Sequence, residues 1–283
     1  MNTPLLHTTD ARFGAPHNAW QGGPQQVSLV RRPPEPVVAT LAAEPAAVQI
    51  DLGRSALVVV DMQNDFCHPQ GWFGQRGLDI APCRQPIPVI AGLLPAWRDA
   101  GGRVVWLNWG IRADAANLPP SVHYKAKGGD PAAVGYGEVS PEDHGPSLVR
   151  GSWGAAMVDE LRAAPTDLLV DKHRLSGFFD SELDGVLRAQ GITTLLFAGI
   201  NTDRCVYSTL QDAAFLGYDC LLVSDACNTP SPAHVSDAIH YLVRLLHGFV
   251  TDSVAVHAAL AAGLSLDPSP DPAPPAPPLP LQP

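Results

Sequence analysis

Short apolar runs alternate along this chain with longer segments in which apolar residues recur every three or four positions. The short runs are rich in β-branched and large apolar residues, which is typical of buried parallel strands, and lie at 55–61, 103–109, 167–172, 193–199, 218–226 and 249–254. The helical spacing lies at 84–100, 152–164, 181–191, 202–217 and 231–248. This alternation predicts an α/β fold: a mostly parallel, roughly six-stranded sheet between two helical layers, a three-layer αβα sandwich.

Three segments show no sustained period. Residues 1–50 are rich in Pro, Ala, Gly and Gln and predict an extended arm that lies on a neighbouring subunit. Residues 265–283 are dense in proline, which favours a disordered or polyproline tail. Between them, residues 51–264 are long enough for one domain with a full core. Residues 110–150 inside that domain are polar and rich in Gly and Pro, which is typical of a functional lid or a disordered loop.

Composition narrows the classes of partner. The formal net charge is -10 and basic runs are missing, which argues against nucleic acid or an anionic membrane as a partner. No apolar run approaches the roughly 20 residues that span a bilayer, and the first residues lack the pattern of a secretory signal. We therefore expect a cytoplasmic protein. The five scattered cysteines indicate reduced thiols, and without a CxxC pair or His-rich tract we expect no metal and no cofactor.

Three residues with matching chemistry stand where strands end. Asp61 ends the first predicted strand, Lys172 ends the third, and Cys205 follows the fourth. In a parallel sheet the carboxyl ends of the strands form one crevice, so these side chains are expected to meet. Cys205 falls in the first turn of the predicted helix, where the unpaired N–H groups and the helix dipole favour a thiolate.

Together these residues predict covalent catalysis. A neighbouring ammonium stabilises a thiolate, and a carboxylate can take a proton and return it to a leaving amine. Taken singly, each residue has an ordinary explanation. A cysteine early in a helix is often a small buried residue, an aspartate at the end of a strand often caps a helix or turn, and a lysine at the end of a strand is usually solvated. Their joint occurrence at three strand ends favours the catalytic interpretation.

Three segments resemble, in order, the motifs of the isochorismatase-like cysteine hydrolase superfamily. They are 58–67 (VVVDMQNDFC), 170–192 and 197–218, and the resemblance covers about 52–262. It implies that Asp61, Lys172 and Cys205 are the catalytic residues. It also implies a cis peptide bond between Ile200 and Asn201, with the N–H groups of Asn201 and Cys205 forming an oxyanion hole for a tetrahedral intermediate.

Differences within the superfamily suggest the bond that is cleaved. True isochorismatases replace the cysteine, so its retention here favours C–N cleavage. Nicotinamidases carry a metal site built from an Asp and two His after the second strand, and residues 109–120 lack such a pair, so we expect no catalytic metal. Residues 151–161 and 176–192 most resemble the ureidoacrylate amidohydrolases. The resemblance implies a small ureido or amide substrate, a thioester intermediate, release of ammonia or an amine with a carbamate, and a homo-oligomer, dimeric or tetrameric.

Residues near the strand ends and in the long loop are predicted to bind substrate. They are Gln63, Asn64, Phe66, Asn108, Trp109, Arg112, Lys125, Leu175, Phe178 and Ile200. Arg112 or Lys125, with Arg174 as a second candidate, would anchor a carboxylate. Leu175 departs from the ureidoacrylate group, which tends to have a bulkier polar aromatic there.

Three alternatives stay open. A biuret or triuret hydrolase would act on a neutral substrate and would need no cationic anchor. A non-catalytic binding protein would be expected to have lost Asp61, Lys172 or Cys205, and all three are present. A thiol redox sensor would be expected to have a resolving cysteine beside Cys205 in sequence, and none is adjacent.

Overall fold

The computed structural model describes residues 11–263, and within them six strands form one parallel sheet. The strand order is β11–β10–β9–β6–β7–β8. The bounds are β6 (Ser55–Val60), β7 (Arg103–Trp109), β8 (Leu168–Lys172), β9 (Thr194–Ile200), β10 (Asp219–Asn228) and β11 (Phe249–Thr251). The predicted parallel sheet and its strands are confirmed, and the predicted tail 265–283 lies outside the described residues.

The two central strands are apolar because neither of their faces meets water. Every residue of β6 and β9 is buried. Val60 pairs with Leu107 on one side and Gly199 on the other, so β6, β7 and β9 end at one level. The residues that follow these ends are therefore brought together at one edge.

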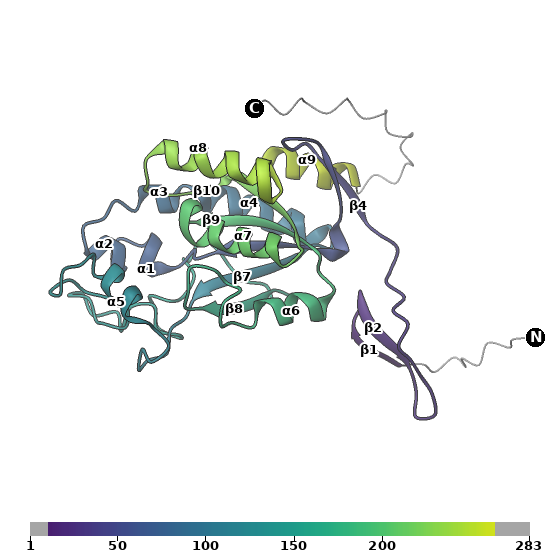
Figure 1. Ribbon diagram of the computed structural model, residues 1–283, viewed down its shortest axis with the longest axis horizontal. Helices are drawn as coiled ribbons and strands as arrows, with labels where there is room; N and C mark the ends of the chain where they lie inside the picture. Colours follow the sequence, from purple (N-terminus) through teal and green to yellow (C-terminus); the bar gives the residue numbers. More distant parts are fainter. Residues whose placement is uncertain (1–10, 264–283) are drawn as a thin grey trace, which may run out of the picture.

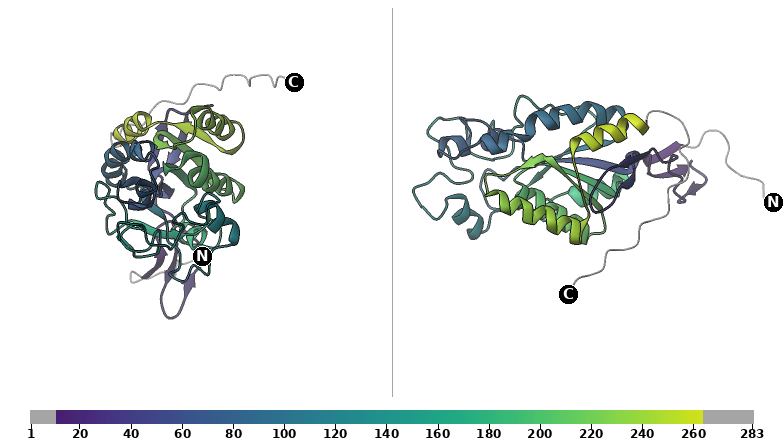
Figure 2. Two further views of the ribbon diagram at one scale, coloured as in Figure 1. Left: turned by 90° about the vertical axis from the view of Figure 1, so that its left-hand side faces the viewer. Right: turned by 90° about the horizontal axis from the view of Figure 1, so that it is seen from above.

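Helices cover both faces of the sheet, as the αβα prediction requires (Figures 1 and 2). On one face lie α4 (Pro86–Asp99) and α9 (Ser253–Gly263), and on the other lie α7 (Tyr207–Phe215) and α8 (Ala233–Leu242). A further helix, α6 (Leu183–Gln190), connects β8 to β9 and ends at Gly191, whose φ of 74° suits glycine. The sequence did not predict α9.

Short helices and loops build the end of the molecule where the central strands finish. Figure 1 shows α1 (Asn64–Cys67), α2 (Trp72–Gln75) and α5 (Pro120–Ala126) gathered there, with the hairpin of β1 and β2 at the opposite end. The short helix α3 (Ala81–Arg84) leads into α4. Helices this short show too few apolar repeats for a period to be recognised.

The helix predicted over 152–164 is wrong: this segment is an irregular, partly extended strip. Its carbonyl groups accept hydrogen bonds from the backbone around α1. Asn64 N donates to Ala156 O (2.9 Å) and Asp65 N donates to Gly154 O (2.9 Å), while Val158 N donates to Met62 O (3.1 Å). These tertiary hydrogen bonds take the place of helical ones and override the local spacing of apolar residues.

The N-terminal region contains strands that its composition did not predict. β1 (Ala11–Ala15) and β2 (Asn18–Gly22) form a hairpin that β3 (Val27–Ser28) extends. β4 (Val38–Leu41) pairs with β5 (Val48–Asp51), and β4 packs against α9. Residues 38–51 are therefore part of the body of the molecule, joined to β6 by the 3-10 turn η1 (Leu52–Arg54).

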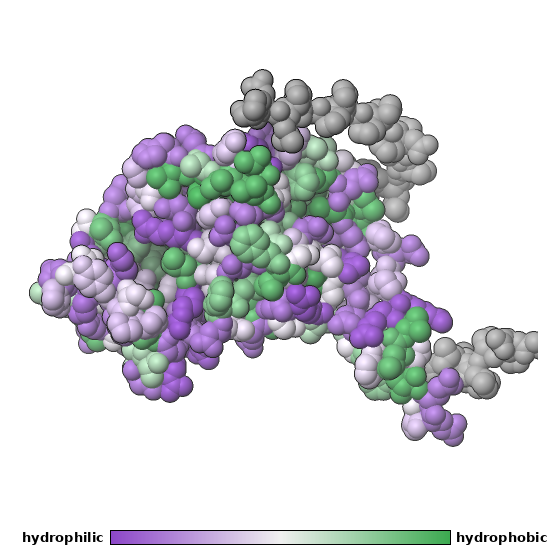
Figure 3. Space-filling view, in the orientation of Figure 1, coloured by the Kyte–Doolittle hydropathy of each residue, from purple (hydrophilic) through white to green (hydrophobic). Residues whose placement is uncertain are grey.

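The surface of the described residues carries both polar and apolar side chains. Phe13 and Trp20 pair across the hairpin and are 53% and 41% exposed, and Figure 3 shows the apolar colour over this hairpin. Within residues 11–263 no helix is long and apolar enough to cross a membrane.

Candidate active site

Asp61 occupies the first position after β6, where its φ of 53° turns the chain out of the sheet. Its N–H donates to Leu107 O (2.9 Å), and its carboxylate is 2% exposed. Oδ2 lies 2.9 Å from Lys172 Nζ, and Oδ1 accepts a hydrogen bond from Trp109 N (3.1 Å). A side-chain hydrogen bond links the same carboxylate to Cys205. Asp61 is thus the shared partner of the predicted cation and nucleophile.

Lys172 is the last residue of β8 and pairs in register with Trp109 of β7. Its side chain is fully buried, and Nζ also donates to Arg174 O (3.3 Å). The ammonium lies 4.4 Å from the centroid of the Trp109 ring, within cation–π range. A buried cation is tolerated only with partners of this kind, so Lys172 and Asp61 depend on each other.

Cys205 lies in a π-helical turn, η2 (Thr202–Val206), that precedes α7. The sequence placed it in the first turn of a regular α-helix, and the structure corrects this. Its carbonyl accepts from Thr209 Oγ1 (2.6 Å), and that hydroxyl in turn accepts from Gly177 N (3.1 Å). The Ile200–Asn201 peptide bond just before the turn is cis, as the resemblance implied.

The protonation of Cys205 differs from the expected thiolate. Burial and, after it, the nearby negative charge of Asp61 raise the pKa of the Cys205 thiol to about 12, against the opposing effect of Lys172. Burial also raises the pKa of Asp61, while the Lys172 charge opposes that shift. Both shifts disfavour a resting thiolate on Cys205 and make the Asp61 carboxyl a stronger base than usual.

The Gln63 side chain holds the backbone of Trp109 in place through hydrogen bonds. Its Oε1 accepts from Trp109 N (2.8 Å), and its Nε2 donates to Trp109 O (2.8 Å) and Ala155 O (2.7 Å). The amide is fully buried and all its donors and one acceptor position are used by the protein. Gln63 was predicted to bind substrate, and in the structure it fixes the position of Trp109.

A cavity of about 780 Å³, called here the Trp109 cavity, opens beside these residues. Trp109 and Arg204, the neighbour of Cys205, both line it, and Lys172 Nζ lies against the ring of Trp109. The full lining is Trp72, Phe73, Arg76, Leu78, Trp109, Ser121, Val122, Lys125, Ala126, Tyr136, Arg174, Leu175 and Arg204. Four cations and no acidic residue belong to this lining, although the chain as a whole carries a net charge of -10.

The structure brings only part of the predicted substrate-binding set to this cavity. Trp109, Lys125 and Leu175 line it, as does Arg174. Arg112 instead pairs with Asp114 (2.7 Å) and borders a separate cavity of about 1010 Å³.

Several other predicted residues lie elsewhere. Asn64 donates to Trp153 O (2.9 Å) beside a third cavity, Phe66 packs edge-on against Phe73 (5.0 Å), and Phe178 packs against Tyr218 (5.7 Å). Ile200 is fully buried before the cis bond. Asn108 is buried, and its Oδ1 has no hydrogen-bond partner within residues 11–263.

Nine residues of the cavity wall escaped the sequence reasoning: Trp72, Phe73, Arg76, Leu78, Ser121, Val122, Ala126, Tyr136 and Arg204. Trp72 and Arg76 have helical spacing just after the first motif, which is a usable signal. Tyr136 stands between two glycines in the polar loop, where a bulky aromatic is unexpected. Among residues 11–263, no three His, Cys, Asp or Glu side chains are grouped so that they could hold a metal ion.

Comparison with known proteins shows which family shares this fold and these residues. The model of the Isochorismatase domain matches residues 55–253. A cysteine hydrolase from Pseudomonas syringae pv. phaseolicola 1448A is 25% identical, covering 76% of this chain and 95% of that chain, with a TM-score of 0.63. An isochorismatase family protein from Desulfovibrio vulgaris subsp. vulgaris str. Hildenborough is 30% identical over 74% of this chain and 98% of its own, with a TM-score of 0.59.

A third solved structure carries a named amidase activity. The N-carbamoylsarcosine amidase from Thermoplasma acidophilum is 27% identical, covering 71% of this chain and 96% of that chain, with a TM-score of 0.53. The match to the family model spans most of the chain, including β6 to β11 and the three residues Asp61, Lys172 and Cys205. The chain is therefore an enzyme of the isochorismatase-like cysteine hydrolase superfamily.

Proposed function

We propose that this protein is an amidohydrolase that cleaves a C–N bond of a carbamoyl or ureido compound, ureidoacrylate-like, through a thioester on Cys205. One observation carries the proposal: the buried carboxylate of Asp61 contacts both the Lys172 ammonium and the Cys205 sulfur. The named activity of the Thermoplasma acidophilum relative is consistent with this bond type.

The first step transfers the thiol proton. Asp61 takes the proton from Cys205 as the sulfur attacks the carbonyl carbon, so that the thiolate exists only when an electrophile is in place. Lys172 stays within ion-pair distance of Asp61, at 2.9 Å in the free site. The oxygen of the tetrahedral intermediate would be held by the N–H groups of Asn201 and Cys205.

The second step breaks the C–N bond. Asp61 returns its proton to the departing nitrogen, and ammonia or an amine leaves while the carbonyl carbon stays bonded to sulfur. Water then attacks this thioester and gives a proton to Asp61, which passes it to the departing sulfur. The product of a ureido substrate is a carbamate, which loses CO₂, and the enzyme returns to its starting protonation.

The charged residues in the wall of the Trp109 cavity favour an anionic substrate. Lys125 and Arg174 line it and no acidic residue does, so the local field favours a carboxylate over a neutral end group. A neutral ureido compound such as biuret or triuret is the second candidate, favoured by Leu175, which offers no donor at the position where the ureidoacrylate group tends to have a polar aromatic.

Ammonia release tests the reaction. We expect the wild type to release ammonia from ureidoacrylate, and Cys205→Ser to lower kcat/KM by about 10³-fold or more because the hydroxyl is a much weaker nucleophile. Cys220→Ser is the matched control, since Cys220 is buried in β10 and its sulfur donates to the backbone carbonyls of Leu210 and Tyr218.

Two results would contradict the proposal. One is near-normal turnover by Cys205→Ser with a melting temperature like that of the wild type. The other is failure of the wild type to release ammonia from a panel of ureidoacrylate, biuret, triuret, N-carbamoyl amino acids and simple amides.

A further inference from the structure

Tyr136 stands in the Trp109 cavity although it belongs to the loop between α5 and β8. Its ring centroid lies 5.0 Å from that of Trp72 and 5.1 Å from that of Trp109. Because the two indoles flank the phenol, its ring has a defined position on the wall that Trp109 shares with the catalytic site.

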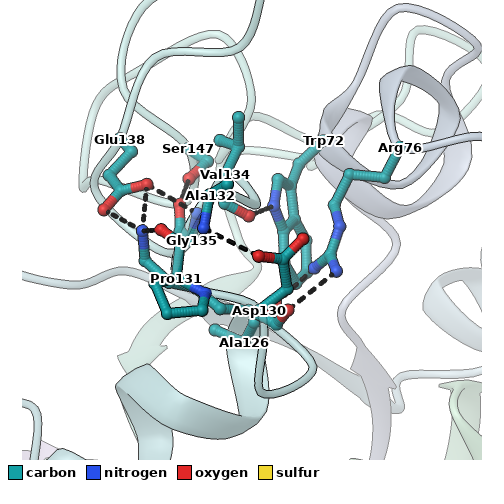
Figure 4. A network of polar contacts seen from close by, with 11 residues as sticks. Trp72, Arg76, Ala126, Asp130, Pro131, Ala132, Val134, Gly135, Glu138 and Ser147 are labelled. Carbon is teal, nitrogen blue, oxygen red and sulfur yellow. Dashed lines mark hydrogen bonds and ion pairs between the residues drawn. The ribbon is translucent and has the colours of Figure 1, made fainter.

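The loop that carries Tyr136 is tied to α2, as Figure 4 shows. Trp72 Nε1 donates to Val134 O (2.8 Å), two residues before Tyr136. The Arg76 guanidinium donates to the carbonyl oxygens of Ala126 and Lys127 at the start of the loop. α2 therefore anchors the loop at two points.

The turn around Tyr136 is held by polar contacts, of which Figure 4 shows those that Glu138 and Ser147 make with Gly135. The Glu138 carboxylate accepts from Gly135 N (2.9 Å) and pairs with Lys127 Nζ (2.7 Å). Ser147 Oγ donates to Gly135 O (2.7 Å), and Gly137 N donates to Ser147 O (2.9 Å). The backbone on both sides of Tyr136 is therefore held by hydrogen bonds, which fixes where its side chain begins.

The hydroxyl itself is uncommitted. Tyr136 is half-buried on the cavity wall, and within residues 11–263 its hydroxyl makes no hydrogen bond to another protein group. Burial raises the pKa of Tyr136, and the charge of Asp61 acts in the same direction, so the hydroxyl keeps its proton. The guanidinium groups of Arg204 and Arg76 act on it in the opposite sense, which places two cations near it.

We propose that Tyr136 is a substrate-binding residue whose hydroxyl donates a hydrogen bond to the carboxylate of the substrate. This rests on the proposed function and names the contact for the non-reacting end of the substrate. The cavity offers a phenolic donor without an internal partner, nearby guanidinium groups and no lining acid, which together suit a carboxylate. Leu175, on the same cavity wall, has no donor of its own, so Tyr136 supplies from the loop the hydroxyl that Leu175 lacks.

Binding to an inactive background tests this contact without relying on turnover. Calorimetric titration compares Cys205→Ala with Cys205→Ala/Tyr136→Phe, using ureidoacrylate as the anionic probe and biuret as the neutral probe. We expect loss of the hydroxyl to lower the affinity for ureidoacrylate about tenfold and the affinity for biuret less than about twofold. The reason is that a charge-assisted hydrogen bond is lost only for the anion. Cys205→Ala/Tyr124→Phe is the control, because Tyr124 is 61% exposed on α5 and does not line the cavity.

Kinetics of Tyr136→Phe in the active enzyme give a second measurement. We expect KM for ureidoacrylate to rise about tenfold with kcat nearly unchanged. Unchanged affinity, equal weakening of both probes, or no binding of ureidoacrylate to Cys205→Ala overturns the proposal for Tyr136. Absence of turnover by the wild type, with the affinity difference present, counts against the proposed reaction and leaves the Tyr136 contact standing.

Discussion

At the level of single residues, the site depends on one carboxylate with several partners. Asp61 Oδ2 contacts Lys172, Oδ1 accepts from Trp109 N, and the carboxylate also contacts the Cys205 sulfur. Lys172 and Asp61 are both almost completely buried, so neither charge is solvated if the other is removed. The chemistry and the stability of this part of the fold are therefore coupled.

Removing the ammonium should destabilise the fold as well as stop catalysis. We expect Lys172→Met to lower the free energy of unfolding by about 3–5 kcal/mol, because Asp61 would be left as an unpaired buried carboxylate. Urea denaturation followed by circular dichroism measures this. The double variant Lys172→Met/Asp61→Asn should recover part of the loss, and equal stability of Lys172→Met and wild type would contradict the coupling. Arg188→Gln, which breaks an exposed i,i+4 pair with Asp184, serves as the control and should change stability little.

The pKa of Cys205 predicts how the sulfur titrates. The folded value, about 12, lies above the ordinary value of 9.0, so the protonated sulfur favours the folded state. This contribution is fully present below about pH 9 and is lost as the pH rises toward 12. Thiolate absorbance in the ultraviolet, compared between wild type and Cys205→Ser, should show no ionisation of Cys205 near neutral pH. A thiolate step near neutrality would restore the sequence-based expectation of a resting thiolate.

At the level of elements, residues 153–158 of the irregular strip 152–164 form hydrogen bonds with the segment that carries the first motif. Gly154 O accepts from Asp65 N, and the Asp65 carboxylate accepts from Trp72 N (3.0 Å) and Leu148 N (2.6 Å). A methyl group at Gly154 would overlap this carboxylate. Asp65 cannot move away without breaking hydrogen bonds to α2 and to the long loop.

Gly154→Ala tests this role of the strip. We expect it to lower the free energy of unfolding by about 1–3 kcal/mol, the usual cost of overpacking, and to lower kcat/KM because α2 and the loop shift. Gly185→Ala in α6 is the matched control, since a methyl group there meets open space. It should stabilise the protein by about 0.5–1 kcal/mol through helix propensity. Thermal and urea denaturation measure both, and a Gly154→Ala variant as stable as wild type would contradict the argument.

The central strands show most clearly why the sequence could predict an element. Strands such as β6 and β9 are buried on both faces, so their apolar runs follow directly from their environment. Because parallel strands end together, Asp61, Lys172 and Cys205 were also predictable as neighbours. The strip 153–158 and Tyr136 were not, since hydrogen bonds from distant residues fix both. The protonated state of Cys205 was missed for a related reason: burial of the sulfur outweighs the charge of Lys172, and sequence position does not report burial.

At the level of the whole molecule, the folded body begins before the boundary that composition suggests. Ala39 and Leu41 of β4 are 1% exposed, and Ile50 of β5 is 6% exposed. Glu44 exchanges backbone hydrogen bonds with Val250 of β11 (2.8 and 2.9 Å), and Thr251 Oγ1 donates to Ala42 O (2.7 Å). The pair β4–β5 thus joins the edge of the central sheet and covers α9.

Two deletions separate the hairpin of β1 and β2 from the body. Removing residues 1–36 leaves β4 and β5 intact, and we expect the free energy of unfolding to change by about 1 kcal/mol or less because residues 11–36 bury little apolar surface. Removing residues 1–51 exposes the surface that Leu41 and Ile50 cover and should lower that free energy by about 3–6 kcal/mol. Urea denaturation and ammonia release measured on both proteins give the comparison. Equal stability of the two truncated proteins would show that β4 and β5 contribute nothing to the stability of the body. A large loss of stability only in the protein that lacks residues 1–51 would place the start of the folded body near residue 37.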